Sequence, residues 1–409
     1  MIEKTRKIVS QFIKHRLFMS VYLPSFLVAF AWGVRMPILP LYAREISNVY
    51  GLIGLIVAGA GLGKLLTDLP AGNLIWRMDK RLAMILGIAL DGLSTLALVW
   101  SNSIWLAIIF CLLGGVGHAI FSIARHTYIT NAVRVNIRGR ALSIFGGILR
   151  IGLFLGPALG GVLAAKIGLR VPFVAFALIS MAAILMLFFA KDHFDAETHQ
   201  DSHNPKLGFR EVFTGRVSVF AMASLAHVLA QITRAGEGLI LPLWGADVLN
   251  LSPDQIGWTV SLSAGVSMIL FYPVGLIMDR LGRKFAIIPS FVIMGLGLAL
   301  LPLTNGFAGL LWVSAMIGLG HGMGSGTMLV LGSDLSPQKG RSLYLGAWSL
   351  IGDFGNSSGP LILGFVADIL ALPFASLTIA GAGVLAGAMF GFFVPETLKK
   401  KQQPEKIKV

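Results

Sequence analysis

Charged residues are scarce in this 409-residue chain. Asp, Glu, Lys and Arg make up 13% of it, against roughly 25% in a soluble globular protein. Apolar residues make up 56%. This balance excludes a soluble domain as the main body of the protein and indicates that lipid surrounds most of the chain.

Cysteine is nearly absent as well. Cys111 is the only one, which excludes an intramolecular disulfide and a metal site built from cysteines. The sequence also lacks an HExxH, a GxSxG, a P-loop and paired carboxylates at a useful spacing. We therefore expect no enzyme activity, no ATP-driven pump within the chain, no cofactor and no metal. Three histidines between 191 and 216 are read as solvated rather than as ligands.

Apolar windows of about 20 residues recur along the chain, and each is long enough to cross a hydrocarbon core as a helix. Because lipid offers the backbone no partners, windows of this length predict helices, and the fold class is all-α integral membrane. About twelve spans are expected, near 17–41, 51–75, 82–101, 104–130, 141–165, 169–190, 217–246, 255–278, 285–304, 307–333, 342–370 and 373–394.

The formal charge of +14 is unevenly distributed. Connections after odd-numbered spans hold only Arg44, Lys166 and Arg170, whereas the tails and the even connections carry nearly all other extramembrane bases. This is the positive-inside pattern, which predicts a multi-pass cell-membrane protein with both termini cytoplasmic. It also argues against nucleic acid as the partner of these bases. The domains follow as tail 1–16, bundle 17–190, linker 191–216, bundle 217–394 and tail 395–409.

The two halves of the chain repeat one another. "ILPLY" at 38–42 recurs as "ILPLW" at 240–244, and "FLGPALGG" at 154–161 recurs as "SSGPLILG" at 357–364. These matches, with Gly-His at 117 and 320 and "GRALS" at 139, all lie 201 to 203 positions apart. Two similar six-span bundles predict a binding site at their interface near the midplane, reached alternately from each side.

The run "GLIMDRLGRK" carries the most specific motif. It matches the loop signature G-x-x-x-D-R-x-G-R-K, and "GLFLGPALGG" resembles an element associated with antiporters. The sequence thus resembles the major facilitator superfamily over essentially Leu17 to Val394, and most of all its drug:proton antiporter group with twelve spans. The matching residues are Gly275, Asp279, Arg280, Gly282, Arg283 and Lys284 in the loop, and Gly152, Gly156, Pro157, Gly160 and Gly161 in span 5.

The resemblance assigns the loop to a latch that holds the cytoplasmic side closed. It implies that Asp279 lies near a helix N-terminus of the other half and that Arg283 binds an acid, for which Asp334 is the candidate. "GNLIWRMDKR" is a damaged copy, with Trp76 at the aspartate position, so we expect a weaker latch there. Its matching residues are Gly72, Arg77, Lys80 and Arg81. The alternative is that these bases only anchor topology.

Ionisable residues inside spans are functional candidates, because an unpaired charge in lipid is costly. The repeat sets Arg35 opposite Glu237, and Arg150 opposite Asp353. A proton-coupled transporter needs a carboxylate whose proton affinity changes between states. Glu237 is the first candidate, with Arg35 or Arg234 as its cation, and Asp353 with Arg150 is the second.

Helical spacing places further polar residues on shared faces. One stripe in span 7 holds His227, Gln231, Arg234 and Glu237, and one in span 4 holds His118, Ser122 and Arg125. These stripes suit the wall of a wet cavity, although Arg234 and Glu237 could instead neutralise each other. His118 and His321 are each expected to be packed and hydrogen-bonded, and Lys64 and Asp68 to form a structural pair. Asp91 is expected to be a satisfied or interfacial acid rather than a proton carrier.

The expected function is proton-coupled export of amphipathic or drug-like molecules by a secondary active transporter. The protein is expected to contact membrane lipid and to function as a monomer. The small number of charges and the wide apolar spans favour a hydrophobic substrate that aromatic side chains hold. The candidate aromatic residues are Trp32, Tyr42, Trp244 and Trp348. The alternative is a transporter or flippase of lipid-like or organic-anion substrates, which the bases Arg35, Arg125 and Arg150 would suit. A sensor on the same scaffold is a third possibility.

Overall fold

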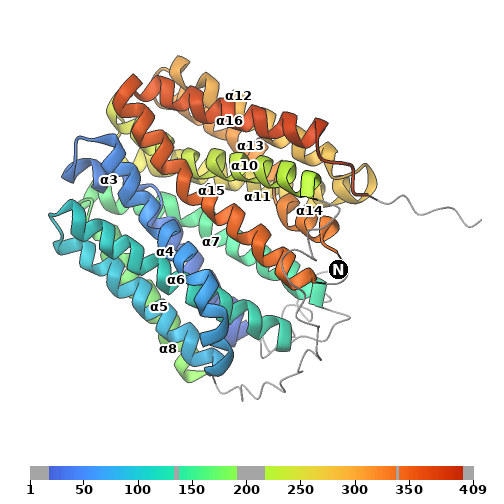
Figure 1. Cartoon of the computed structure of the whole chain (residues 1–409). Coiled ribbons are helices and arrows are strands. Elements are labelled where there is room, and N and C mark those ends of the chain that lie inside the picture. The colour runs from blue at the N-terminus through green and yellow to red at the C-terminus, as the bar shows by residue number, and fades with distance from the viewer. Residues whose placement is uncertain (1–17, 133–137, 191–216, 338–339, 399–409) are drawn as a thin grey trace, which may run out of the picture.

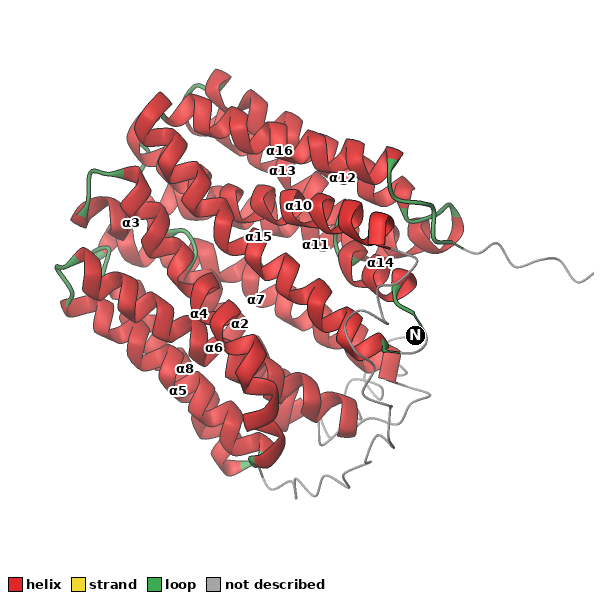
Figure 2. Cartoon of the chain, in the orientation of Figure 1, coloured by secondary structure: helices red, strands yellow, loops and turns green. Residues whose placement is uncertain are grey.

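The computed structural model describes residues 18–132, 138–190, 217–337 and 340–398 (Figure 1). Within them, only the backbone is described for 69–77, 130–132, 138–141 and 342. The described part is helical and contains no strand (Figure 2).

The first half consists of α2 to α8, preceded by a π-helical turn. Its elements are η1 (Phe18–Tyr22), α2 (Leu23–Arg35), α3 (Ile38–Ile46), α4 (Tyr50–Arg77), α5 (Lys80–Ala97), η2 (Leu98–Trp100), α6 (Ile104–Ala132), α7 (Arg138–Lys166) and α8 (Val171–Phe189).

The second half repeats this order of helices from α10 onward. Its elements are α10 (Val217–Leu243), η3 (Trp244–Val248), α11 (Pro253–Arg280), α12 (Lys284–Leu300), η4 (Leu301–Leu303), α13 (Gly306–Met323), α14 (Thr327–Leu335), α15 (Arg341–Leu370) and α16 (Leu372–Phe392).

Eleven helical segments of the described chain are long and apolar enough to cross a membrane, by length and composition. The twelfth expected span is α15, which has 30 residues and carries Asp353 and Asn356 near its middle. These polar side chains lower the mean hydropathy of α15, so it is not among the eleven apolar segments. Both side chains face the cavity described below.

Two of the expected spans are interrupted. Span 1 is two helices, α2 and α3, because Pro37 supplies no N–H to continue the first of them. Span 10 breaks between α13 and α14, where Gly326 adopts φ +74°, a conformation that suits glycine. The corresponding span of the first half, α6, continues unbroken, so the repeat is not exact at this position.

The helices form two bundles, with α2, α4, α5, α6, α7 and α8 in one and α10 to α16 in the other (Figure 1). The bundles meet along α4 with α15 and along α7 with α11. Small residues let these helices approach closely: Ser357 of α15 lies against Gly61 of α4, and Gly257 of α11 lies against Gly161 of α7. The end that carries the 275–284 loop is called the motif end below, and the end with Ser47–Val49 the opposite end.

Candidate functional site

A cavity of about 410 Å³ lies between the two halves. Seven of the residues singled out from the sequence line it, and they come from α2, α4, α6, α10 and α15. These are Trp32, Arg35, Lys64, His118, Gln231, Arg234 and Asp353. The rest of the wall is largely apolar, so the cavity combines a hydrophobic surface with a few charged side chains.

Arg35 is paired inside its own half, not with Glu237. Its Nη1 lies 3.4 Å from Asp91 Oδ1 and donates to Thr95 Oγ1 at 2.8 Å. Trp32 Nε1 donates to Asp91 Oδ2 at 2.9 Å, and the Trp32 ring lies 4.4 Å below the guanidinium. Asp91 is thus a satisfied acid, and its neutralising cation is the arginine that the sequence had set opposite Glu237.

Glu237 is buried and faces the interior of the second half. Its Oε1 accepts from Ser263 Oγ at 3.1 Å, and its Oε2 lies 3.2 Å from Nδ1 of His321. Arg234, one turn away on α10, forms no ion pair with it. The local neutralisation considered for Arg234 and Glu237 is therefore replaced by a contact with His321.

Lys64 joins the two halves at the cavity wall. Its Nζ lies 3.6 Å from Asp68 Oδ2 on the same helix and donates to Asp353 Oδ1 of α15. The expected Lys64–Asp68 pair is present, but it is part of a larger cluster. Asp353 is held by Lys64 and not by Arg150, because Arg150 reaches the break in span 10 instead.

Arg150 and Arg234 both reach the break in span 10. Arg234 Nη2 donates to the Gly324 carbonyl oxygen at 2.7 Å, and Arg150 donates to the Ser325 hydroxyl. The Arg150 guanidinium also lies 4.4 Å from the centre of the Phe271 ring. Among the described residues, neither arginine has a carboxylate within ion-pair distance.

The remaining members of the polar stripes are packed on aromatic rings. Arg125 lies between Phe121 and Phe145, 4.8 Å from each ring centre, and donates to Ser122 only at 3.5 Å. The rings of His118 and Trp32 are 4.3 Å apart, and those of His227 and Trp348 are 4.4 Å apart. His118 is packed as expected, but its buried Nδ1 makes no hydrogen bond.

Three of the four candidate substrate aromatics belong to the core. The Tyr42 hydroxyl donates to the carbonyl oxygens of Leu98 and Ser101, and Trp244 Nε1 donates to Thr304 Oγ1 at 3.0 Å. Trp348 Nε1 donates to the Met328 carbonyl at 2.9 Å. All three are buried and do not line the cavity in this conformation. Their polar atoms already have partners, and only Trp32 borders the cavity.

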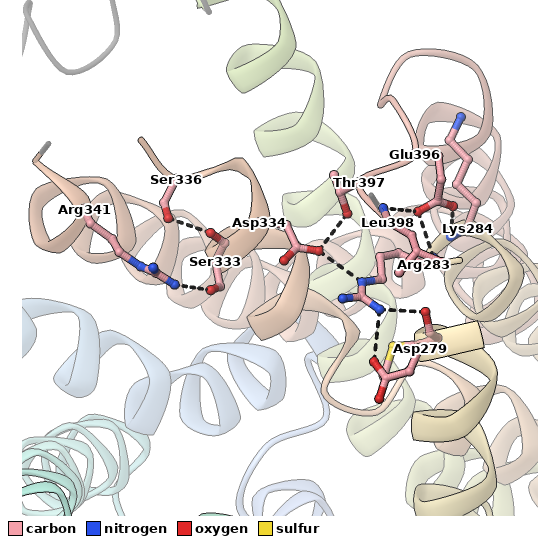
Figure 3. A network of polar contacts seen from close by, with 11 residues as sticks. Asp279, Arg283, Lys284, Ser333, Asp334, Ser336, Arg341, Glu396, Thr397 and Leu398 are labelled. Atoms are coloured by element: carbon pink, nitrogen blue, oxygen red, sulfur yellow. Dashed lines mark hydrogen bonds and ion pairs between the residues drawn. The ribbon is translucent and has the colours of Figure 1, made fainter. Parts of the chain in front are cut away.

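A polar network surrounds the 275–284 loop at the motif end (Figure 3). Arg283 Nε donates to Asp334 Oδ2 at 3.0 Å, the partner that the sequence indicated, and its Nη1 lies 3.1 Å from Asp279 Oδ1. Asp279 is 76% exposed and contacts its own half. Among the described residues, Asp279 does not reach a helix N-terminus of the other half, and the loop's contacts in this conformation lie within its own half.

Glu396 fixes the end of the loop and was missed from the sequence. Its carboxylate accepts from the backbone N–H groups of Arg283 at 3.0 Å, Lys284 at 3.1 Å and Leu398 at 2.9 Å (Figure 3). Burial alone would raise the pKa of Glu396, but these bonds outweigh it and hold the pKa below its usual 4.5. A carboxylate at the start of α12 also offsets the helix dipole.

The described contacts of the damaged copy lie within its own half. Asp79 accepts from Leu82 N–H at 2.8 Å and caps α5, while Lys80 and Arg81 donate to backbone carbonyls. For Gly72 and Arg77 the structure describes the backbone only, so the predicted contacts of these residues lie outside the described part. Asp79 thus acts as a helix cap and not as a substitute for the missing aspartate at 76.

The opposite end is held closed by charges that sequence reasoning overlooked. Arg44 Nε lies 3.0 Å from Asp247 Oδ2, and the Tyr50 hydroxyl donates to the same oxygen at 2.8 Å. Asp368 accepts from the N–H groups of Tyr50 and Gly51, both at 2.7 Å. A carboxylate of one half therefore caps helix α4 of the other, the chemistry that the family resemblance assigned to the motif end.

The span-5 glycines pack on two neighbours. Gly152, Gly156 and Gly160 lie against the backbone of α2 in the same half. Gly161 lies against α11 of the other half, where a Cβ would come within 2.5 Å of the Pro253 carbonyl oxygen. The Pro157 carbonyl meets Gly257 of α11. This element is thus a small-residue packing surface that also joins the two halves.

A comparison with protein-family models identifies the family of this chain. The family model described as Major Facilitator Superfamily matches residues 21–232 and 223–408. The chain belongs to this superfamily. Members and structural neighbours are transporters, so the protein is a transporter and not an enzyme.

Individual major facilitator relatives are distant. The chain is 23% identical over 356 residues to an uncharacterized MFS-type transporter of Methanocaldococcus jannaschii, covering 86% of this chain and 91% of the other. It is also 23% identical over 356 residues to multidrug resistance protein 2 of Bacillus subtilis, covering 85% and 88%. The crystal structure of the nucleoside transporter NupG superposes with a TM-score of 0.76 at 14% identity, covering 92% of this chain and 100% of that one, and this likeness concerns the fold alone.

Proposed function

We propose that this transporter exports amphipathic, drug-like small molecules in exchange for protons, by alternating access. The contacts between the halves support the alternation. The opposite end is closed by Arg44, Asp247 and Asp368, whereas Asp279 of the motif loop is exposed and bound within its own half. The excess of bases at the motif end supports a cytoplasmic position for that end.

The cluster of Lys64, Asp68 and Asp353 carries the proton coupling. One ammonium group lies between two carboxylates, and only one of these belongs to the same half as the lysine. A proton that neutralises Asp353 removes the charge that attracts Lys64 across the interface, which weakens the closed opposite end. Because Lys64 and Asp353 are only partly exposed at the cavity wall, their attraction is stronger than that of a fully exposed pair, and this single protonation changes the balance between the two conformations.

The nature of the cavity supports an amphipathic substrate. Its wall is mostly apolar, with Trp32 as its aromatic surface and with charges confined to a few positions. Its volume of about 410 Å³ lies within the range of small-molecule sites. The Bacillus subtilis relative is named a multidrug resistance protein, which favours export of foreign molecules as the direction.

Proteoliposomes test this function. The full chain is reconstituted with a pH-sensitive dye inside, and a panel of amphipathic fluorescent probes is added under an imposed pH gradient. We expect probe movement against its own gradient, accompanied by proton movement in the opposite direction. Asp353→Asn should reduce this coupled movement at least tenfold while probe exchange without a gradient continues.

Glu45→Gln is the matched control, because it removes an exposed acid away from the cavity and should leave coupled movement unchanged. Exchange without a gradient also separates uncoupling from misfolding, since a misfolded variant loses both activities. The proposal is wrong if the wild-type chain moves probes with no accompanying proton flux, or if Asp353→Asn retains coupled movement.

A further inference from the structure

We infer that the transported molecule carries an anionic group and that this group binds between the guanidinium groups of Arg150 and Arg234. The inference deepens the proposed function, because it assumes that the cavity is the substrate site, but it does not depend on proton coupling.

The two arginines come from different halves and meet at one short backbone segment. Arg150 lies on α7 and Arg234 on α10. Their partners are the adjacent residues Ser325 and Gly324, at the break between α13 and α14. The side chain of Arg234 also lines the cavity, so a molecule in the cavity can reach this segment.

Within the part of the chain that the structure describes, neither guanidinium is neutralised by a carboxylate. Each offers five N–H donors, yet the described part of the chain gives Arg150 one hydroxyl and gives Arg234 one carbonyl oxygen and a long contact with Gln231 at 3.4 Å. Arg234 Nε is buried and has no partner. The nearest acid along α10 is Glu237, whose two oxygens face Ser263 and His321.

The other cations of the cavity already have carboxylates. Arg35 is paired with Asp91, and Lys64 with Asp68 and Asp353. An incoming anion therefore gains little at those positions and most at Arg150 and Arg234, where two unpaired positive charges lie in the bilayer interior at considerable cost.

The surroundings of the pair define the chemical class of the anion. Guanidinium groups form forked bonds with planar or tetrahedral oxyanions, which suits a carboxylate or a phosphate. Phe271 under Arg150 and Phe291, 5.2 Å from the Arg234 guanidinium, provide apolar surface beside the charges. An amphipathic acid fits this combination better than a small inorganic ion.

Equilibrium binding to the purified full chain in nanodiscs of zwitterionic lipid tests the inference. Two probes with the same fluorescent apolar body are compared, one ending in a carboxylate and the other in a quaternary ammonium group. We expect the wild-type chain to bind the carboxylate probe at least tenfold more tightly. Arg234→Gln and Arg150→Gln should each raise the Kd of the carboxylate probe about tenfold or more. Neither variant should raise the Kd of the ammonium probe.

Arg170→Gln is the matched control, because Arg170 binds Val99 and Asn102 away from the cavity. Arg234→Lys retains the charge but loses the fork, so it should lie between wild type and Arg234→Gln. A further arm replaces the carboxylate probe with a fluorescent phosphatidic acid. Tighter binding of the lipid would identify a phospholipid headgroup as the source of the anion, and tighter binding of the probe a soluble organic acid.

The inference is overturned if the two charged probes bind the wild-type chain equally, or if both Arg→Gln variants keep the wild-type preference. These outcomes are independent of the proton-flux assay, because binding is measured without a gradient. A chain that binds anions but shows no coupled flux would retain this inference and lose the proposed coupling.

Discussion

Arg44 and Asp247 occupy almost equivalent places in the two repeats, just after "ILPLY" and "ILPLW", and they bind each other across the interface at 3.0 Å. The repeat thus supplies opposite charges to the two halves at the end where those halves close. Tyr50 contributes a second bond to Asp247, so this acid has two partners in the other half.

Asp247→Asn should favour opening of the opposite end. The substitution removes a partly exposed ion pair worth about 1 kcal/mol, which corresponds to a roughly fivefold shift in population. A cysteine at Met36, which lines the cavity, reports the change in a Cys111→Ala background. We expect a membrane-impermeant maleimide added at the opposite end to label it several times faster. Glu45→Gln should not change the labelling rate, and an equal rate in both variants would show that Asp247 does not hold this end closed.

Gly161→Ala should destabilise the same closed interface by another route. An added Cβ would lie 2.5 Å from the Pro253 carbonyl oxygen, so α7 and α11 must separate. Overpacking of this kind costs about 1–3 kcal/mol, which predicts faster labelling at Met36 from the opposite end. Gly147→Ala on the same helix meets no atom within 4 Å and is the control. Equal labelling in the two alanine variants would contradict the assigned contact.

Arg35→Gln should lower the stability of the fold. It leaves Asp91 buried without its cation, which costs about 3–5 kcal/mol. Asp91→Asn should have a comparable effect, whereas the double variant Arg35→Gln/Asp91→Asn should recover much of the loss. The measurement is the melting temperature and the yield of monodisperse protein in size-exclusion chromatography. Strict additivity of the two single effects would show that the residues do not interact in solution.

Glu396→Gln should reduce thermal stability in a pH-dependent way. Because the pKa of Glu396 is lowered in the folded chain, its ionised form stabilises the motif end above the usual pKa of 4.5. That contribution is lost as the pH falls below 4.5 and through the lowered value. We expect a melting temperature about 2 °C below wild type at pH 7, and a difference that shrinks under strongly acidic conditions. A constant difference at all pH values would indicate lost packing instead of a lost charge.

The fold could be predicted almost entirely from the sequence. Apolar windows bounded by charged or proline-containing loops determine where helices begin in lipid, so α6 starts at the expected residue 104 and α11 within two residues of 255. The breaks were missed because they depend on details within an apolar window. Pro37 and the Gly324–Gly326 segment are too short to change hydropathy, yet they interrupt the helical hydrogen bonds.

The partners of the charged side chains were harder to predict. The sequence singled out Arg35, Glu237 and Asp353 as charges within spans, but the repeat register paired them by symmetry. In the structure, Arg35 and Glu237 bind within their own halves, because a side chain chooses its partner by helix rotation and reach rather than by repeat position. Arg44 and Asp247 lie one position out of register, because the offset of 202 sets Arg44 opposite Ala246, so pairing by repeat position would have missed them as well.

Helix α14 spans nine residues, about 13 Å of axial length. Gly324 and Ser325 precede it and hold the two guanidinium groups, and Asp334 near its other end holds Arg283 of the loop. Since the chain is interrupted just before α14, this segment can tilt without bending α13. We therefore expect that binding in the cavity and the contacts of the loop influence each other through α14, so that a variant altered at one of them changes the other.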